Sequence, residues 1–173
     1  MRQLLLLRHA KAAVAASDRD RGLTPAGRRA AAVMRRAMRD LGLAPDLVLV
    51  SDARRALETL EALEPWDETP LVDPLAELYL ADAADILATL NEVAETVRGV
   101  LLIAHNPGLG DLVAILAAGA EAAGRDVAPR LAEGFPTAAL AEFSVAGPWG
   151  QLDATNARLV RLIRPRDLGE PAG

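Results

Sequence analysis

The two histidines of this chain both stand where an apolar run ends. His9 follows residues 4–7 and Arg8, and His105 follows residues 100–104. Apolar runs of this length, bounded by turn signals, are typical of buried parallel strands. Ligands of open α/β sheets bind outside the carboxyl ends of such strands. We therefore expect both imidazoles at one edge of a sheet, where a ligand can meet them.

Arginines also follow the ends of predicted strands, as the two histidines do. A third apolar run, residues 47–50, is followed closely by Arg54 and Arg55, and Arg21 lies in the polar loop after the first run. In a helix that begins near residue 53, neighbouring side chains point about 100° apart, so we expect only one of this pair to face the site. Guanidinium groups bind phosphoryl oxygens through a rigid fork of donors. The combination predicts a phosphate site.

Histidine beside arginine is suited to phosphoryl transfer. A neutral ring nitrogen of His9 can attack phosphorus if an acceptor holds the other nitrogen and so fixes the tautomer. His105 precedes a turn, Asn106-Pro107-Gly108, and a predicted helix. At that position it can donate to a phosphoryl oxygen, and the helix N-terminus favours an anion. Each histidine also fits a structural role. His9 can be part of a surface Arg-His pair, and His105 can cap its own loop.

Strand and helix signals alternate along the chain, which is typical of a mainly parallel sheet covered by helices. Strands are predicted over residues 4–7, 46–50, 71–72, 99–104, 138–145 and 157–163. Helices are predicted over residues 25–41, 53–63, 82–97 and 108–118. Thr24 and Pro25 form a typical helix start, as N-cap and first helical residue. The last two strands are predicted as an antiparallel edge, and the Ala- and Gly-rich residues 119–129 as loose helix or loop.

Composition indicates a single domain over residues 1–164, with a frayed tail over residues 165–173. None of the 173 residues is cysteine, which excludes disulfides, thiolate catalysis and cysteine-ligated zinc. The formal net charge of −5 argues against a general nucleic-acid or anionic-membrane surface. The first apolar run is too short for a secretory or membrane-spanning segment, so we expect a cytoplasmic protein, with a monomer as the simplest state.

Taken in order, the motifs resemble those of the histidine phosphatase superfamily, and most of all its short SixA-type phosphohistidine phosphatases. The resemblance rests on Arg8-His9, Ser51-x-x-x-Arg55-Ala56-x-x-Thr59, the Ala-His-Asn-Pro-Gly of residues 104–108, and two further segments, 21–27 and 136–140. Each block is weak alone, but together they follow the expected order over most of the chain. The resemblance implies a phosphoglycerate mutase-like fold, which is a three-layer α/β/α sandwich around a mainly parallel sheet.

The resemblance also implies a role for each matched residue. His9 matches the nucleophile, which takes up the phosphoryl group and then loses it to water. Arg8, Arg55 and His105 match the rest of the phosphate pocket, and Arg21 matches a further basic position. The family's usual glycine after the nucleophile is alanine here, so the turn must suit a Cβ.

The resemblance does not assign the general acid to a definite residue. Many members of the superfamily place a carboxylate where this chain has Glu77, with Asp20 and Asp82 as weaker rivals, and such a group protonates the leaving oxygen. In the SixA-type branch this segment need not have that role. Imidazole leaves a phosphoramidate more readily than an alkoxide leaves an ester. A poor acid therefore favours a phosphohistidine substrate.

We predict a metal-independent phosphatase without a cofactor, which hydrolyses phosphohistidine on a protein through a covalent intermediate on His9. The chain lacks long insertions, so we expect an open pocket that admits a phosphorylated side chain of another protein, for example a histidine-phosphotransfer domain. One alternative is a small-molecule phosphomonoesterase that uses Glu77 as its acid. Others are a non-catalytic phosphate-binding module and a metal site of two histidines, which the neighbouring arginines disfavour.

Overall fold

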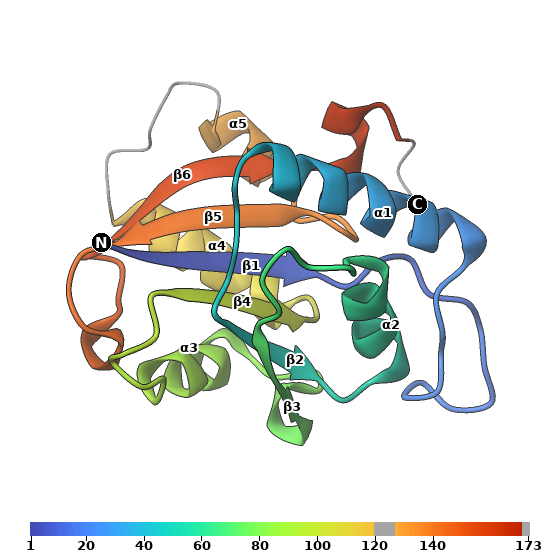
Figure 1. The fold of residues 1–173 in the computed structure, drawn as a ribbon, viewed down its shortest axis with the longest axis horizontal. Coiled ribbons are helices and arrows are strands. Elements are labelled where there is room, and N and C mark those ends of the chain that lie inside the picture. Colours follow the sequence, from blue (N-terminus) through green and yellow to red (C-terminus); the bar gives the residue numbers. More distant parts are fainter. Residues whose placement is uncertain (120–126, 171–173) are drawn as a thin grey trace.

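The computed structural model describes residues 1–119 and 127–170, with a six-stranded sheet at the centre (Figure 1). The strand order is β3-β2-β4-β1-β5-β6. The strands are β1 (Arg2–Arg8), β2 (Leu47–Ser51), β3 (Leu71–Leu75), β4 (Gly99–Ala104), β5 (Leu140–Val145) and β6 (Ala157–Ile163). β1 to β4 run parallel, whereas β5 and β6 pair antiparallel along one side. The predicted mainly parallel α/β fold with an antiparallel edge is confirmed.

The central strands bring the two histidines to one edge of the sheet. β1 and β4 pair in parallel with Arg8 opposite Ala104, so His9 and His105 follow side by side at the carboxyl ends. β2 lies on the other side of β4 and ends at Ser51. This edge is where ligands of such sheets bind.

Helices cover both faces of the sheet. Successive strand residues point to opposite faces, and because apolar residues lie on both, each face must be covered. The helices are α1 (Pro25–Asp40), α2 (Arg54–Ala62), α3 (Ala83–Asn91), α4 (Gly108–Ala118) and α5 (Val127–Ala132). Leu5 and Leu7 of β1 belong to the core beneath α1 and α2, while Leu4 and Leu6 belong to the core beneath α3 and α4. This is the expected three-layer arrangement. In the described part of the chain, no helix is long and apolar enough to cross a membrane.

The start of α1 follows the sequence prediction, whereas the end of α3 does not. Thr24 caps α1 by accepting a backbone hydrogen bond at 2.9 Å. α3 stops at Asn91, although the sequence predicts a helix as far as Val97. The Asn91 amide donates to the Trp149 carbonyl, and the Trp149 indole donates to the Val97 carbonyl. Tertiary hydrogen bonds to a distant segment therefore override the helical signal.

The C-terminal segment is ordered where the sequence predicts a frayed tail. A short 3₁₀ helix, η3, covers Pro165–Leu168, and its start is capped by Arg164 and Asp167. The Arg164 guanidinium is nearly buried and pairs with the carboxylates of Asp167 and Glu133. A buried guanidinium needs such partners, and they hold this segment against the domain. α5 begins near the end of the Ala- and Gly-rich segment, and the predictions for residues 120–126 and 171–173 lie outside the described residues.

Gly108 is required where the first residue of α4 passes the loop before α3. A Cβ on Gly108 would lie 1.9 Å from the carbonyl oxygen of Ala81 and 2.9 Å from the Asp82 Cα. Because both contacts are with backbone, Gly108→Ala is expected to lower the free energy of unfolding by roughly 2–3 kcal/mol, as overpacking does. Urea denaturation measures the loss. Gly150→Ala is the control, since its Cβ would lie 3.7 Å from its nearest neighbour, and an equal loss in both variants would contradict this explanation.

Candidate active site

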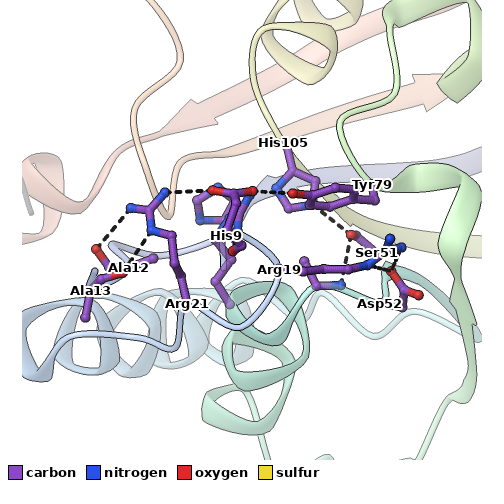
Figure 2. A network of polar contacts seen from close by, with 12 residues as sticks. His9, Ala12, Ala13, Arg19, Arg21, Ser51, Asp52, Tyr79 and His105 are labelled. Carbon is purple, nitrogen blue, oxygen red and sulfur yellow. Dashed lines mark hydrogen bonds and ion pairs between the residues drawn. The ribbon is translucent and has the colours of Figure 1, made fainter. Parts of the chain in front are cut away.

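A pocket of about 360 Å³ lies at the carboxyl ends of β1, β2 and β4. Five of the six predicted site residues line it, namely Arg8, His9, Arg21, Arg55 and His105. The lining also includes Lys11, Ala12, Asn106 and Thr137. Figure 2 shows His9 and His105 together, with Arg21 on one side and Tyr79 on the other. Segments that are far apart in the sequence thus meet at one edge of the sheet.

His9 is buried, with 7% of its surface exposed, and a backbone carbonyl holds its ring. Nδ1 lies 2.8 Å from the Ala10 carbonyl oxygen, which can only accept, so Nδ1 carries the hydrogen and Nε2 has the free lone pair. Burial, and after it the charges of Arg55 and Arg8, lower the pKa of His9 to about 4, although the Ala10 hydrogen bond raises it. The ring is therefore neutral at neutral pH and has a nucleophilic nitrogen.

The turn at Ala10 suits alanine. Leu80 and Ala138 are the non-glycine residues with positive φ in the described structure, so Ala10 needs no left-handed conformation. Its N–H donates to the Thr59 hydroxyl at 2.9 Å, and that hydroxyl donates to the Arg55 carbonyl at 2.7 Å. The threonine of the motif thereby ties this turn to the first turn of α2.

His105 is held by Ser51 at the end of β2. The Ser51 hydroxyl oxygen lies 2.7 Å from His105 Nε2 and accepts a hydrogen bond from the Ala53 N–H at 3.3 Å. The hydroxyl can donate to Nε2 or accept from it, so this contact orients the ring in either tautomer. Burial first, then the charges of His9 and Arg55, lower the pKa of His105 to about 3. This ring is neutral as well.

Two buried nitrogens of the pocket residues have no hydrogen-bond partner in the described structure, Nδ1 of His105 and Nε of Arg8. Buried polar atoms are nearly always paired, so an unpaired donor needs an explanation. Both residues line the pocket. An anionic ligand with several acceptor oxygens, such as a phosphoryl group, would bring hydrogen-bond acceptors to the two residues that carry these atoms.

Arg55 faces the pocket and Arg54 does not, as their angular spacing requires. Arg55 is 3% exposed and donates to the Asp18 carbonyl at 2.7 Å and to the Asp18 carboxylate at 3.1 Å. Arg54 is exposed and donates to Glu58 at 3.0 Å. Arg21 donates to the second carboxylate oxygen of Asp18 at 3.2 Å. The first residues of α2 thus supply one guanidinium to the pocket and one to the surface.

Asp18 and Tyr79 belong to the site although no pattern in the sequence indicates them. Hydrogen bonds from the Tyr79 hydroxyl and from two arginines hold the pKa of the Asp18 carboxyl well below its usual range. The Tyr79 ring packs edge-on against His105, with centroids 5.6 Å apart. In the sequence, Asp18 lies in a run of alternating charges that also contains Asp20, so nothing distinguishes the two aspartates.

The predicted acid is the one predicted site residue that does not line the pocket. Glu77 lies in a 3₁₀ helix, η1 (Ala76–Leu78), and is exposed. The apolar Leu78 fills the core at this point, which leaves Glu77 on the outer side of the turn. Of the weaker rivals, Asp82 caps α3 and Asp20 is exposed, and neither lines the pocket. The structure therefore places none of these three carboxylates among the residues that line the pocket.

The charges of the pocket suit an anion. Three arginines and a lysine are among its lining residues, which include no carboxylate. Positive charge in a cleft raises the local concentration of anionic substrates. Within residues 1–119 and 127–170, no group of three or more His, Cys, Asp or Glu side chains is placed to hold a metal ion.

Known proteins match this chain in sequence. The model of the histidine phosphatase superfamily (branch 1) matches residues 4–92. An uncharacterized protein of Mycobacterium tuberculosis (strain ATCC 25618 / H37Rv) is 35% identical over 167 residues, which cover 92% of this chain and 100% of that protein.

Solved structures match it in fold. A candidate phosphohistidine phosphatase SixA from Nakamurella multipartitia is 30% identical, with a TM-score of 0.83 over 95% of this chain and 96% of that one. The protein histidine phosphatase SixA complexed with tungstate is also 30% identical, with a TM-score of 0.76 over 96% of this chain and 99% of that one. A mycobacterial glucosyl-3-phosphoglycerate phosphatase, 22% identical, shares the fold alone, with a TM-score of 0.57 over 95% and 98%. On its sequence and its fold, this chain belongs to the histidine phosphatase superfamily.

Proposed function

We propose that this protein is a phosphatase that takes a phosphoryl group onto His9 Nε2 and then releases it to water. The state of His9 carries the proposal, because its buried ring is neutral, its Nδ1–H is held by a carbonyl, and its pocket is lined by arginines. A neutral imidazole with a free lone pair is a nucleophile for phosphorus. Membership of the histidine phosphatase superfamily supports the same reaction.

In the first step His9 Nε2 attacks phosphorus in line with the leaving group, and the bond to the leaving group breaks. Arg8, Arg55 and the Nδ1–H of His105 bind the peripheral phosphoryl oxygens and stabilise their charge in the transition state. The His9 ring becomes cationic, because Nδ1 keeps its hydrogen. The Ala10 carbonyl accepts that hydrogen throughout.

In the second step a water molecule attacks phosphorus and the bond between phosphorus and His9 Nε2 breaks. The electron pair returns to Nε2, so His9 ends the cycle neutral and inorganic phosphate is released. Burial and the neighbouring cations lower the pKa of His9, and they favour the uncharged ring that leaves in this step. The scheme calls for no metal and no cofactor.

We infer further that the substrate is phosphohistidine on another protein. The residues that line the pocket include no carboxylate, so an alkoxide leaving group would find no acid among them. An imidazole with hydrogen on its second nitrogen leaves as a neutral molecule and needs no such acid. The likeness to the two SixA structures supports this substrate class.

His9→Ala is expected to abolish the covalent intermediate and to lower turnover by roughly 10⁴-fold or more, as loss of a nucleophile does. For the measurement, the enzyme is mixed with a radiolabelled phosphohistidine peptide or with a labelled aryl phosphate, and the reaction is stopped rapidly without acid. The labelled phosphoenzyme is then detected and tested for acid lability. An unchanged melting temperature of the variant shows that it is folded. Phosphate or vanadate binding by the wild type without any trapped phosphoenzyme would identify a binding module and overturn the proposal.

Glu77→Gln separates the phosphohistidine phosphatase from a small-molecule phosphomonoesterase of the same superfamily. Because Glu77 is exposed and outside the pocket lining, the substitution is expected to change kcat for an alkyl phosphate ester and for a phosphohistidine peptide by less than about twofold. Loss of a general acid would instead lower ester turnover by roughly 10²–10⁴-fold. Steady-state kinetics on both substrates decide, and selective loss of ester turnover would favour the phosphomonoesterase.

Neither histidine is expected to titrate between about pH 5 and 8, because the pKa of His9 is lowered to about 4 and that of His105 to about 3. The unfolded chain takes up these protons near pH 6.5, so the folded state loses stability as the pH falls from about 6.5 towards 4. The ring C–H resonances of the two histidines, assigned with His9→Ala, measure both values by NMR. A midpoint near 6.5 for His9 would contradict a neutral buried nucleophile.

A further inference from the structure

The loop between β1 and α1 places a carboxylate, Asp18, against two arginines that line the pocket, and the reaction described above does not use it. Asp18 accepts hydrogen bonds from Arg55 at 3.1 Å, from Arg21 at 3.2 Å and from the Tyr79 hydroxyl. Its side chain is nevertheless 45% exposed, whereas His9 is buried. The Asp18 side chain is therefore open to solvent, whereas the Arg55 guanidinium to which it bonds is buried.

These hydrogen bonds leave Asp18 with unused acceptor capacity. A carboxylate offers about four lone-pair sites, two on each oxygen. In the described structure Oδ2 accepts from Arg55 and Tyr79, while Oδ1 accepts from Arg21. One site on Oδ1 is free, on a side chain that is open to solvent. The same donors hold the pKa of Asp18 well below its usual range, so the group stays anionic and has no proton to give.

In-line displacement determines where this acceptor lies relative to the reacting atoms. His9 Nε2 attacks from the floor of the pocket, so the leaving group departs on the opposite side, toward solvent. Arg55 connects the two regions, because its guanidinium lines the pocket and also bonds to Asp18. A leaving group that departs toward solvent past Arg55 would meet the carboxylate of Asp18.

We propose that Asp18 is a specificity-determining residue, whose carboxylate accepts a hydrogen bond from the second ring nitrogen of a phosphoimidazole substrate. The proposal, which rests on the function proposed above, states which leaving groups the pocket selects. In the step, His9 Nε2 bonds to phosphorus, the P–N bond of the substrate breaks, and its electron pair goes to the substrate nitrogen. The substrate ring leaves neutral, with hydrogen still on its second nitrogen. The positive charge passes to the His9 ring.

The same carboxylate disfavours anionic leaving groups. A metabolite with a carboxylate or a second phosphate near the reacting bond would bring like charge beside Asp18, which costs free energy. An aryl phosphate with a good leaving group needs neither a hydrogen nor a positive charge on departure. It leaves as an anion that gains nothing from an acceptor, so removal of the Asp18 charge is expected not to slow its departure.

Asp18→Asn tests the proposal, because it removes the charge and keeps the size of the side chain. It is expected to lower kcat/KM for a phosphohistidine peptide by roughly 10–100-fold, as loss of a charged hydrogen-bond acceptor does. For 4-nitrophenyl phosphate, whose leaving group is an anion, kcat/KM is expected not to fall. The alkaline limb of the pH profile for the peptide, which reports loss of the proton from the substrate ring, is expected to move to lower pH.

Asp52→Asn is the matched control, since Asp52 is a similarly exposed carboxylate that pairs with Arg19 at 2.6 Å. It is expected to leave both rates unchanged. Equal loss on both substrates in Asp18→Asn, or loss on neither, would overturn the proposal, and the former would show that Asp18 only positions Arg55. Failure to trap phosphoenzyme from 4-nitrophenyl phosphate in the wild type would overturn the proposed function itself, so the two failures are distinguishable.

Discussion

Parallel pairing between β1 and β4 is the interaction on which the pocket depends. Its register sets Arg8 level with Ala104, and the rings of His9 and His105 come to lie with centroids 5.0 Å apart. Successive leucines of β1 belong to the cores on opposite faces of the sheet. A slip by one residue would turn every one of them to the other face, so the apolar packing strongly specifies the register. Aliphatic side chains with no part in the chemistry thus fix the spacing of the two rings.

Burial at this edge has a second effect, because it keeps both imidazoles uncharged beside several arginines. A cationic ring among guanidinium groups would be repelled and poorly solvated, whereas a neutral ring is tolerated and keeps its lone pair. Each ring then has one nitrogen occupied by the protein, through Ala10 for His9 and through Ser51 for His105. The second nitrogen of each ring is left for a ligand. The same packing that stabilises the sheet therefore prepares a nucleophilic nitrogen on His9 and leaves one nitrogen of His105 unpaired.

The sequence allowed the strands and most of the pocket to be predicted, because these residues obey local rules. Apolar runs mark β1, β2 and β4, and a residue that directly follows a buried strand must emerge at its carboxyl end. Asp18 and Tyr79 could not be found in this way, since they lie in loops without periodicity and reach the site through tertiary hydrogen bonds. Glu77 was expected in the pocket from the family resemblance alone, and the packing of its neighbour turns it outward. The early end of α3 has a similar cause, a partner more than fifty residues away.

The loop between β1 and α1 is held at its base and, through Asp18, also by Arg55 and Tyr79. An isolated bridge joins Ala12 to Leu23, and the Leu23 N–H donates to Glu58 of α2 at 2.5 Å. Between these points the loop carries Asp18 and Arg21, but no residue of the sheet. The loop thus supplies Arg21 to the pocket and Asp18 beside it, whereas the two histidines follow the ends of β1 and β4. A change in this loop can therefore alter the surroundings of the phosphate while the strand register keeps the two rings in place.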